Sequence, residues 1–248
     1  MSFSPWSLFA NLALAASLTL STGALWASAL TERAVGGDEL EIDRASSVFA
    51  VVTHKAGAAA RLAHDHLIVA RGYSAELRYH PAHPMEASFV FEAPVTSLEI
   101  DSPQAQETWF PRLQELGILD QAFGEMSDKN RAKVRSAMLG PSQLDAERFP
   151  TLSVQVRELR ASADGDRAQT SHQANVVFEI HGQEVEAPFP LRISTTETKV
   201  VFEAFGTLTL SDFGIKPYSA LLGAVRNRDQ VDVFLYLEAT PKPPIPDS

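Results

Sequence analysis

Most of the chain alternates between hydrophobic and polar residues, which is the period of β-strands that bury one face. Turn-forming residues such as His80-Pro81 and His181-Gly182 separate the alternating segments. Eight segments that are also rich in β-branched or aromatic residues are predicted as strands: 47–53, 68–77, 87–93, 152–159, 175–180, 189–193, 199–210 and 230–239. Eight strands with short connections predict an all-β fold, either a closed antiparallel barrel or a sandwich.

Two of these segments carry apolar residues on both faces. Phe234 and Tyr236 interrupt the polar face of segment 230–239, whose other face is aliphatic. In segment 199–210, Ala204 and Gly206 leave space on the inner face. A sheet with one solvated face shows a cleaner polar pattern. We therefore expect one face to line an interior and parts of the other to be covered, with a filled barrel core as the open alternative.

A helical insert over about residues 103–139 interrupts the strands. Ser102 followed by proline is typical of a helix start, and Pro111 and Gly117 predict a break and a stop. A second helix is predicted over 128–139, after a serine N-cap and before a Gly-Pro pair. Its apolar residues are sparse, so we expect it to cover the barrel without forming a core of its own.

The N-terminus has the pattern of an export signal. Residues 7–20 are uncharged and rich in Leu and Ala, and Ala27-Ser28-Ala29 fits a cleavage site. We predict a signal peptide over 1–29, a linker over 30–38, a domain over 39–240 and a disordered Pro-rich tail over 241–248. An uncleaved anchor is the alternative, but the apolar run is short for a span of about 20 residues. The protein is thus expected to be periplasmic or secreted, without a stable membrane anchor.

Composition removes several classes of function. The chain has no cysteine, which excludes disulfides, Cys-ligated metals, thiol nucleophiles and an acylated N-terminal cysteine. A net charge of −10 argues against nucleic acid or an anionic membrane surface as partner, because both require clustered Lys and Arg. The sequence contains no G-x-S-x-G, H-E-x-x-H or P-loop motif. These absences predict a protein that is not an enzyme.

Three groups of short segments resemble the YceI-like family. They follow the family's order over about residues 39–239: S-S-V-F at 46–49 with T-H-K at 53–55 and A-R-G-Y at 70–73; K-V-R-S-A-M-L at 133–139 with L-D-A-E-R-F-P-T-L-S-V at 144–154; F-E-I-H-G-Q at 178–183 with L-S-D-F-G-I at 210–215. The resemblance implies an extended, eight-stranded, lipocalin-like antiparallel barrel, bacterial and usually periplasmic. It also implies a long apolar tunnel for a polyisoprenoid or isoprenoid quinone, and no shared catalytic residues.

The chain departs from the family pattern in two places. The insert over 102–126 is longer than usual, which would alter a lid over the tunnel mouth. His64-Asp65-His66 stands where a short loop is expected. At strand spacing the two histidines face the same side and could bind one metal, with His54 or His181 as a further ligand. The alternative is a polar turn in which Asp65 accepts a hydrogen bond from a backbone N–H.

These observations predict a periplasmic carrier whose partner is an isoprenoid-type apolar lipid, with no cofactor; the sequence is also compatible with a homodimer. The expected tunnel lining is aromatic and aliphatic: Phe49, Val51, Phe89, Phe91, Val154, Phe178, Phe202, Leu208, Phe213 and Phe234. Polar residues expected to hold a headgroup at the mouth are His64, His66, Arg71, His181 and Arg226. Two alternatives remain, a metal- or haem-binding protein that uses His64 and His66, and a filled barrel that acts as an interaction module.

Overall fold

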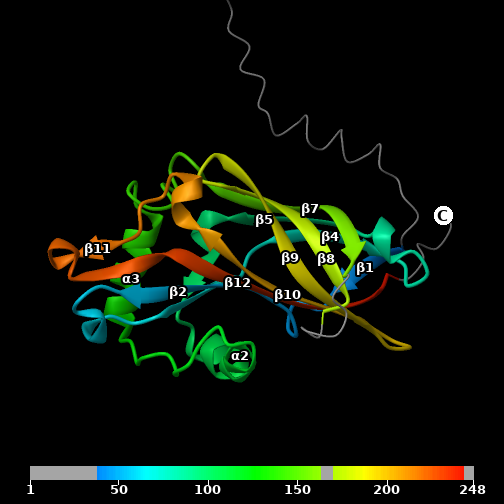
Figure 1. Ribbon diagram of the computed structural model, residues 1–248, viewed down its shortest axis with the longest axis horizontal. Helices are drawn as coiled ribbons and strands as arrows, with labels where there is room; N and C mark the ends of the chain where they lie inside the picture. The colour runs from blue at the N-terminus through cyan, green and yellow to red at the C-terminus, as the bar shows by residue number, and fades with distance from the viewer. Residues whose placement is uncertain (1–37, 163–169, 243–248) are drawn as a thin grey trace, which may run out of the picture. The chain divides into compact units, whose positions relative to one another are not determined.

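An antiparallel sheet closes on itself in the computed structural model, which describes residues 38–162 and 170–242. The ring consists, in spatial order, of β1 (Asp38–Ile42), β4 (Ser74–Tyr79), β5 (Ser88–Pro94), β7 (Thr151–Ala161), β8 (His172–Ile180), β9 (Gln183–Thr195), β10 (Val200–Thr209) and β12 (Val225–Pro241) (Figure 1). β12 pairs with β1 and so completes the ring. The predicted all-β fold and its antiparallel eight-stranded barrel are confirmed.

Three further strands lengthen the sheet on one side. β2 (Val48–Ala56) follows β1 along β12, then β3 (His66–Ala70) pairs with β2, and β6 (Leu98–Ile100) pairs with β3. The single strand predicted over 68–77 is therefore wrong, because the chain bends at residues 71–73 and β3 and β4 have different neighbours. The short β11 (Ser219–Ala220) pairs with the start of β12.

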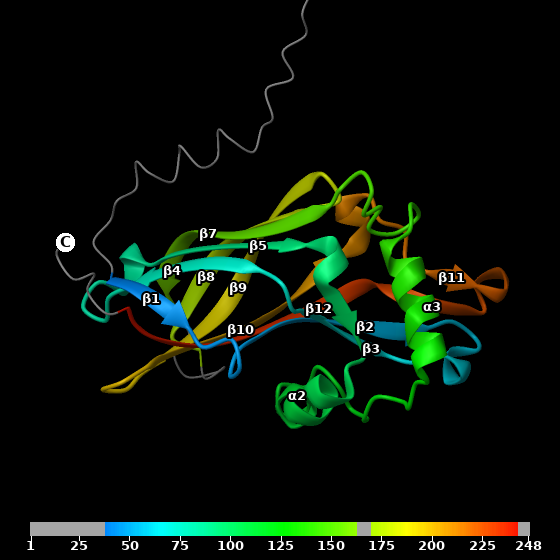
Figure 2. The same cartoon turned by 180° about the vertical axis from the view of Figure 1, so that it is seen from behind.

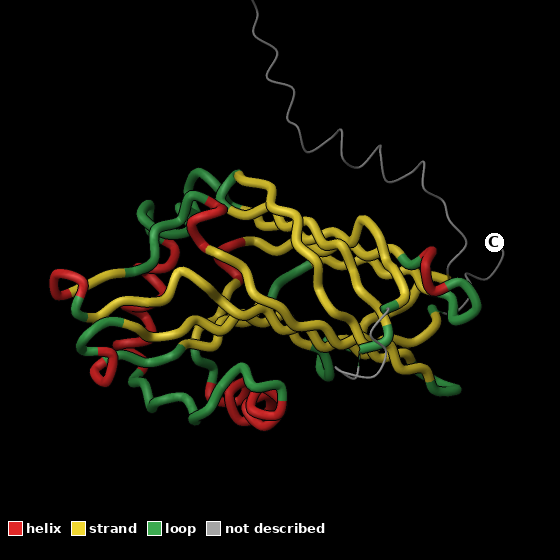
Figure 3. Tube along the Cα trace, viewed as in Figure 1, coloured by secondary structure: helices red, strands yellow, loops and turns green. Residues whose placement is uncertain are grey.

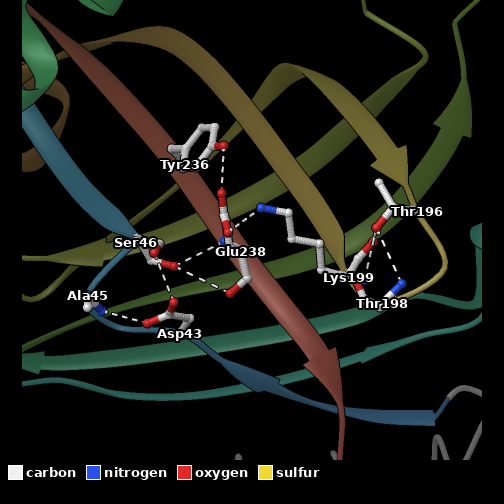
Figure 4. Close-up of polar contacts among 9 residues, drawn as sticks. Asp43, Ala45, Ser46, Thr196, Thr198, Lys199, Tyr236 and Glu238 are labelled. Atoms are coloured by element: carbon white, nitrogen blue, oxygen red, sulfur yellow. Dashed lines mark hydrogen bonds and ion pairs between the residues drawn. The ribbon is translucent and has the colours of Figure 1, made fainter.

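A polar network fastens the junction between β1 and β2 to β12 (Figure 4). The backbone N–H of Glu238 donates to the hydroxyl of Ser47 at 3.1 Å, and that of Asp43 donates to the Glu238 carbonyl at 2.9 Å. The Glu238 carboxylate accepts from Lys199 at 2.7 Å and from the Tyr236 hydroxyl at 3.1 Å. The first two of these bonds satisfy backbone groups where the regular pairing with β12 is interrupted.

The helices follow the sequence with one correction. α3 (Asp128–Leu139) has the predicted bounds, and the hydroxyl of Ser127 accepts from the N–H of Asn130 at 3.4 Å. α2 (Pro103–Glu115) runs through Pro111, so the predicted break is wrong. The fixed φ of proline suits a helix, and here the loss of one N–H bond does not end it. α2 ends at Glu115, and Gly117 follows two residues later with a φ of 71°, which is typical of the glycine that terminates a helix.

The two helices cover different parts of the barrel (Figures 2 and 3). α2 packs on the outer face of β2, β3 and β12, where Leu113 and Phe234 are fully buried. α3 lies across one end of the barrel and contributes to the wall of the interior. The two-sided apolar pattern of segment 230–239 follows from this arrangement, because one face of β12 lines the interior and the other packs against α2.

The predicted signal peptide, the linker up to residue 37 and the tail from residue 243 lie outside the described residues. Among residues 38–162 and 170–242, no helix is long and apolar enough to cross a bilayer.

Candidate ligand cavity

A cavity of about 620 Å³ lies inside the barrel. Side chains such as Val51, Val154 and Val233 stand in the middle of strands and are still only partly buried, because they face this space. The wall includes these predicted tunnel residues: Phe49, Val51, Phe89, Phe91, Val154, Phe178, Phe202, Leu208 and Phe213. The interior is therefore hollow and mainly apolar, and the alternative of a filled core does not describe it.

Phe234 is placed differently from the other predicted tunnel residues. It borders the cavity, but its ring packs in the outer apolar cluster, with its centroid 5.7 Å from that of Trp109 on α2. Side chains alternate along a strand, so it is Val233 and Leu235 that face the interior. Phe234 therefore borders the cavity as predicted, but the packing of its ring against α2 was not predicted, because a strand that is apolar on both faces does not reveal which side chains point inside.

The expected space beside Gly206 is occupied by Phe189. A Cβ added to Gly206 would lie 2.7 Å from Cε1 of the Phe189 ring, which also belongs to the cavity wall. Glycine is therefore required here for the close approach of an aromatic ring. Phe189 was not among the predicted lining residues, although it shares a strand face with Leu191 and this alternation is visible in the sequence.

The two ends of the cavity differ. Near β1 the interior is filled by buried side chains that include Leu40, Tyr79 and Val200, and the ring of Tyr79 meets Phe202 edge-on at 5.2 Å. At the α3 end the wall contains solvent-exposed residues: His64, Asn130, Lys133, Ala137 and Tyr218. The cavity consequently reaches solvent beside α3, and we call this end the opening.

His66 forms the polar part of the wall near the opening. Its Nδ1 lies 2.7 Å from Oδ2 of Asp101, whose side chain is only 3% exposed. The other carboxylate oxygen of Asp101 accepts from the Leu67 N–H at 2.9 Å and from Gln106 of α2 at 3.2 Å. A carboxylate accepts hydrogen bonds, so Nδ1 carries the proton and Nε2 of a neutral His66 is a free acceptor. Asp101 was not among the predicted site residues, because no local motif around it indicates a contact with His66.

Thr53 adds a second polar group beside His66. The two residues are directly paired in β2 and β3, so their side chains are neighbours on one face. Thr53 is 8% exposed and belongs to the cavity wall. Its hydroxyl is buried and has no hydrogen-bond partner among the described residues. An unpaired buried hydroxyl is unfavourable, which makes it available to a polar group of a ligand.

Of the residues predicted for the mouth, the structure brings His64 and His66 to the cavity wall. Arg71 instead binds Glu99 at 2.5 Å, the His181 ring lies 3.0 Å from the Phe213 carbonyl, and Arg226 is exposed at the start of β12. These three residues are not part of the described cavity wall, so this part of the prediction is corrected. Arg71, His181 and Arg226 each lie at the end of a strand. Where a strand end lies relative to the cavity depends on how the sheet closes, which the sequence does not show.

Within the described residues, His64 and His66 are not joined by enough further ligands to hold a metal. No group of three or more His, Cys, Asp or Glu side chains is placed to hold a metal within residues 38–162 and 170–242. His54 pairs with Asp232 at 2.7 Å. Asp65 accepts from the backbone N–H of Lys55 at 2.7 Å, as expected from the alternative of a polar turn.

The His54–Asp232 pair also has an electrostatic effect. Burial by itself raises the pKa of Asp232, but hydrogen bonds from His54 and Thr207 outweigh this, and the pKa of Asp232 is lower than its ordinary value. The hydroxyl of Thr207 donates at 2.7 Å. His54 of β2 and Thr207 of β10 therefore stabilise the ionised carboxylate of Asp232 on β12, and these contacts are a structural feature of the three strands.

The barrel and its internal cavity define a lipocalin-type fold. A family model described as "YceI-like domain" matches residues 41–239, and the chain belongs to this family. The structure is similar to that of BcnA from Burkholderia cenocepacia (TM-score 0.56, 15% identity, 81% of this chain and 100% of that chain). It is also similar to a mutant YceI protein of Campylobacter jejuni (TM-score 0.50, 12% identity, 71% and 85%).

A more distant likeness is to a structure described as a polyisoprenoid binding domain from Saccharophagus degradans (TM-score 0.45, 9% identity, 84% of this chain and 100% of that chain). It is too remote to support a functional argument. A search of the curated proteins found no match.

Proposed function

We propose that the protein is a periplasmic carrier that holds an isoprenoid-type lipid, a polyprenol or a quinone, inside the barrel. The observation that carries this proposal is the mainly apolar cavity of about 620 Å³ with an opening at one end. Small-molecule sites typically measure about 300–1,000 Å³, so one ligand or one section of a longer chain fits. Burying apolar surface there contributes about 25 cal/mol per Å², which accumulates along a chain and requires no sharp sequence motif.

The polar residues at the opening support a ligand that is apolar along its length and polar at one end. His66 and Thr53 offer hydrogen bonds from the wall, and Lys133 and Asn130 of α3 belong to the same wall. A hydroxyl headgroup would accept from Thr53 and donate to Nε2 of His66, and a carbonyl headgroup would accept from Thr53 alone. We propose that these residues fix the headgroup while the chain extends toward Phe202.

Location in the periplasm rests on the predicted signal peptide. Export should remove residues 1–29, and the N-terminus of the protein recovered from the periplasm should then be Leu30. N-terminal sequencing of that fraction checks the proposal. An intact N-terminus on the recovered protein would contradict cleavage.

The binding function is tested by titrating delipidated protein with geranylgeraniol and with a short-chain ubiquinone in a calorimeter. The proposal expects saturable binding at one site, with a negative heat-capacity change because apolar surface is buried. A matched titration with a straight-chain alcohol of similar length tests whether the site prefers isoprenoids. Absence of saturable binding for both isoprenoid ligands would contradict the proposal.

A further inference from the structure

Two exposed leucines project from the turn after β11. Leu221 is 69% exposed and Leu222 is fully exposed, in a protein whose other large apolar side chains are mostly covered. Both have left-handed backbone conformations, with φ of 51° and 55°. This conformation is unfavourable for residues with a Cβ. The turn thus exposes two large apolar side chains to solvent and has a strained backbone at both residues. Polar residues are more usual in a loop that only connects two strands.

The turn lies beside the opening of the cavity. Tyr218 precedes the leucines, Val225 follows them, and both belong to the cavity wall. The carbonyl of Ala224 accepts from the N–H of Ala59 at 2.8 Å, which joins this turn to the loop after β2. Figures 1 and 2 both place β11 and its turn at the end of the barrel where α3 lies. A surface that contacts the leucines would therefore face the cavity opening.

The surroundings of the leucines are basic. Segments 54–64 and 214–228 contain no Asp or Glu, although the chain has a net charge of −10. They contain these cations: Lys55, Arg61, Lys216, Arg226 and Arg228. Arg61, Lys216 and Arg226 are exposed, and none of the ion pairs among the described residues involves them. Asp65 and Asp229 directly follow the two segments in the sequence, and Asp65 lies 3.7 Å from the Lys55 ammonium, which it neutralises in part.

We propose that this basic apolar tip, defined by Leu221, Leu222, Arg61, Lys216 and Arg226, docks on the surface of an anionic lipid bilayer. The leucines would enter the boundary between headgroups and acyl chains, and the cations would face lipid phosphates. Docking there places the opening against the bilayer, where an isoprenoid chain can pass in or out of the barrel. This inference rests on the proposed carrier function.

The basic apolar tip revises an expectation drawn from composition. An acidic chain argues against an anionic membrane surface when its charges are evenly distributed. The fold instead gathers the cations of two segments that are more than 150 positions apart in the sequence around one apolar turn, through the pairing of Arg226 with Ala56. Such contact is peripheral and reversible, because two leucines and a few cations anchor far more weakly than a membrane-spanning helix.

The test is co-sedimentation of the full chain with vesicles made of equal parts phosphatidylglycerol and phosphatidylcholine. The wild-type protein is expected to bind these vesicles and to bind pure phosphatidylcholine about tenfold or more weakly, with binding reduced by added salt. Leu221→Ser/Leu222→Ser and Arg61→Gln/Arg226→Gln are each expected to reduce partitioning about tenfold or more. All variants should keep the wild-type circular dichroism spectrum and thermal midpoint.

Matched controls come from the opposite end of the barrel. Met85→Ser removes another exposed apolar side chain, and Arg78→Gln/Arg160→Gln removes two other exposed cations. These variants are expected to bind anionic vesicles like the wild type. Controls that lose as much binding as the tip variants would overturn the proposal, because the effect would then follow total charge or hydrophobicity.

Two other results would overturn the proposal. One is equal binding of the wild type and both tip variants to anionic vesicles, or no binding by any of them. The other is a concentration-dependent dimer that disappears in Leu221→Ser/Leu222→Ser, which would assign the tip to a second copy of the chain. Uptake of geranylgeraniol from a cyclodextrin complex, without vesicles, separates this proposal from the carrier function, because tip variants should retain it even where docking is lost.

Discussion

Nδ1 of His66 lies 2.7 Å from Oδ2 of Asp101, and the backbone carbonyl of Asp101 accepts a hydrogen bond from Arg131 of α3. Asp101 also accepts from the Leu67 N–H and has a φ of 50°. One buried aspartate therefore connects the polar group of the cavity wall to the helix across the opening. An aspartate suits this position because its carboxylate accepts several hydrogen bonds and its backbone tolerates the left-handed region better than most residues.

Replacement of Asp101 should reveal this double role. Asp101→Ala leaves the buried Leu67 N–H without an acceptor, and the free energy of unfolding should fall by about 1–3 kcal/mol or more. Asp101→Asn retains an acceptor and the tolerance for positive φ, so its free energy of unfolding should fall by less. Urea denaturation measures both variants. Equal stability of the wild type and Asp101→Ala would contradict the account of this contact.

Thr53→Val is expected to have opposite effects on stability and on binding. The buried hydroxyl has no partner, so removing it should raise the free energy of unfolding of the ligand-free protein by about 1 kcal/mol. The same change should weaken binding of a ligand with a polar headgroup. Thr207→Val is the matched control, because its hydroxyl donates to Asp232 and its loss should lower stability. A destabilised Thr53→Val with unchanged binding would show that Thr53 has no headgroup role.

Phe234 and Trp109 should matter for stability and not for the ligand. Phe234 is fully buried against α2, so Phe234→Ala should lower the free energy of unfolding by about 3–5 kcal/mol. Its neighbours on β12 form the cavity wall and remain in place, so ligand affinity measured on the folded variant should stay close to that of the wild type. A large loss of ligand affinity with little loss of stability would indicate that the Phe234 side chain contacts the ligand.

The stability of the barrel should depend on pH through Asp232. The pKa of this carboxyl in the folded protein is below its ordinary value, and the value in the unfolded chain is about 3.9. Its contribution is therefore complete above the unfolded pKa and is lost as the pH falls through the folded pKa. Asp232→Asn should flatten this part of the curve of unfolding free energy against pH. Identical curves for the two proteins would rule out the contribution.

Local patterns were sufficient to predict much of the fold. Alternation along the chain predicted the barrel strands, and the serine before residue 128 fixed the start of α3, because these signals involve neighbouring residues only. The helix through Pro111 was missed because one lost hydrogen bond is offset by packing of α2 on the barrel, which sequence does not display.

The residues of the candidate site were predicted from the sequence less completely than the fold. Many of the wall residues are apolar residues in alternating strands, so they were predicted correctly as a group. The packing of Phe234 against α2 was not predicted, because both faces of β12 are apolar. Thr53, His66 and Asp101 come together only through the pairing of β2, β3 and β6, and no local motif links them.

The most direct test of the account is native mass spectrometry of the protein purified from cells without detergent, with solvent extraction of any bound ligand. The wild type should carry an isoprenoid lipid. Val154→Trp, which fills the cavity from β7, should be folded and empty, and Gln155→Trp, on the opposite face of the same strand, should retain the lipid. An empty wild type that also fails to take up polyprenol or quinone would contradict the central claim, as would equal lipid occupancy in all three proteins.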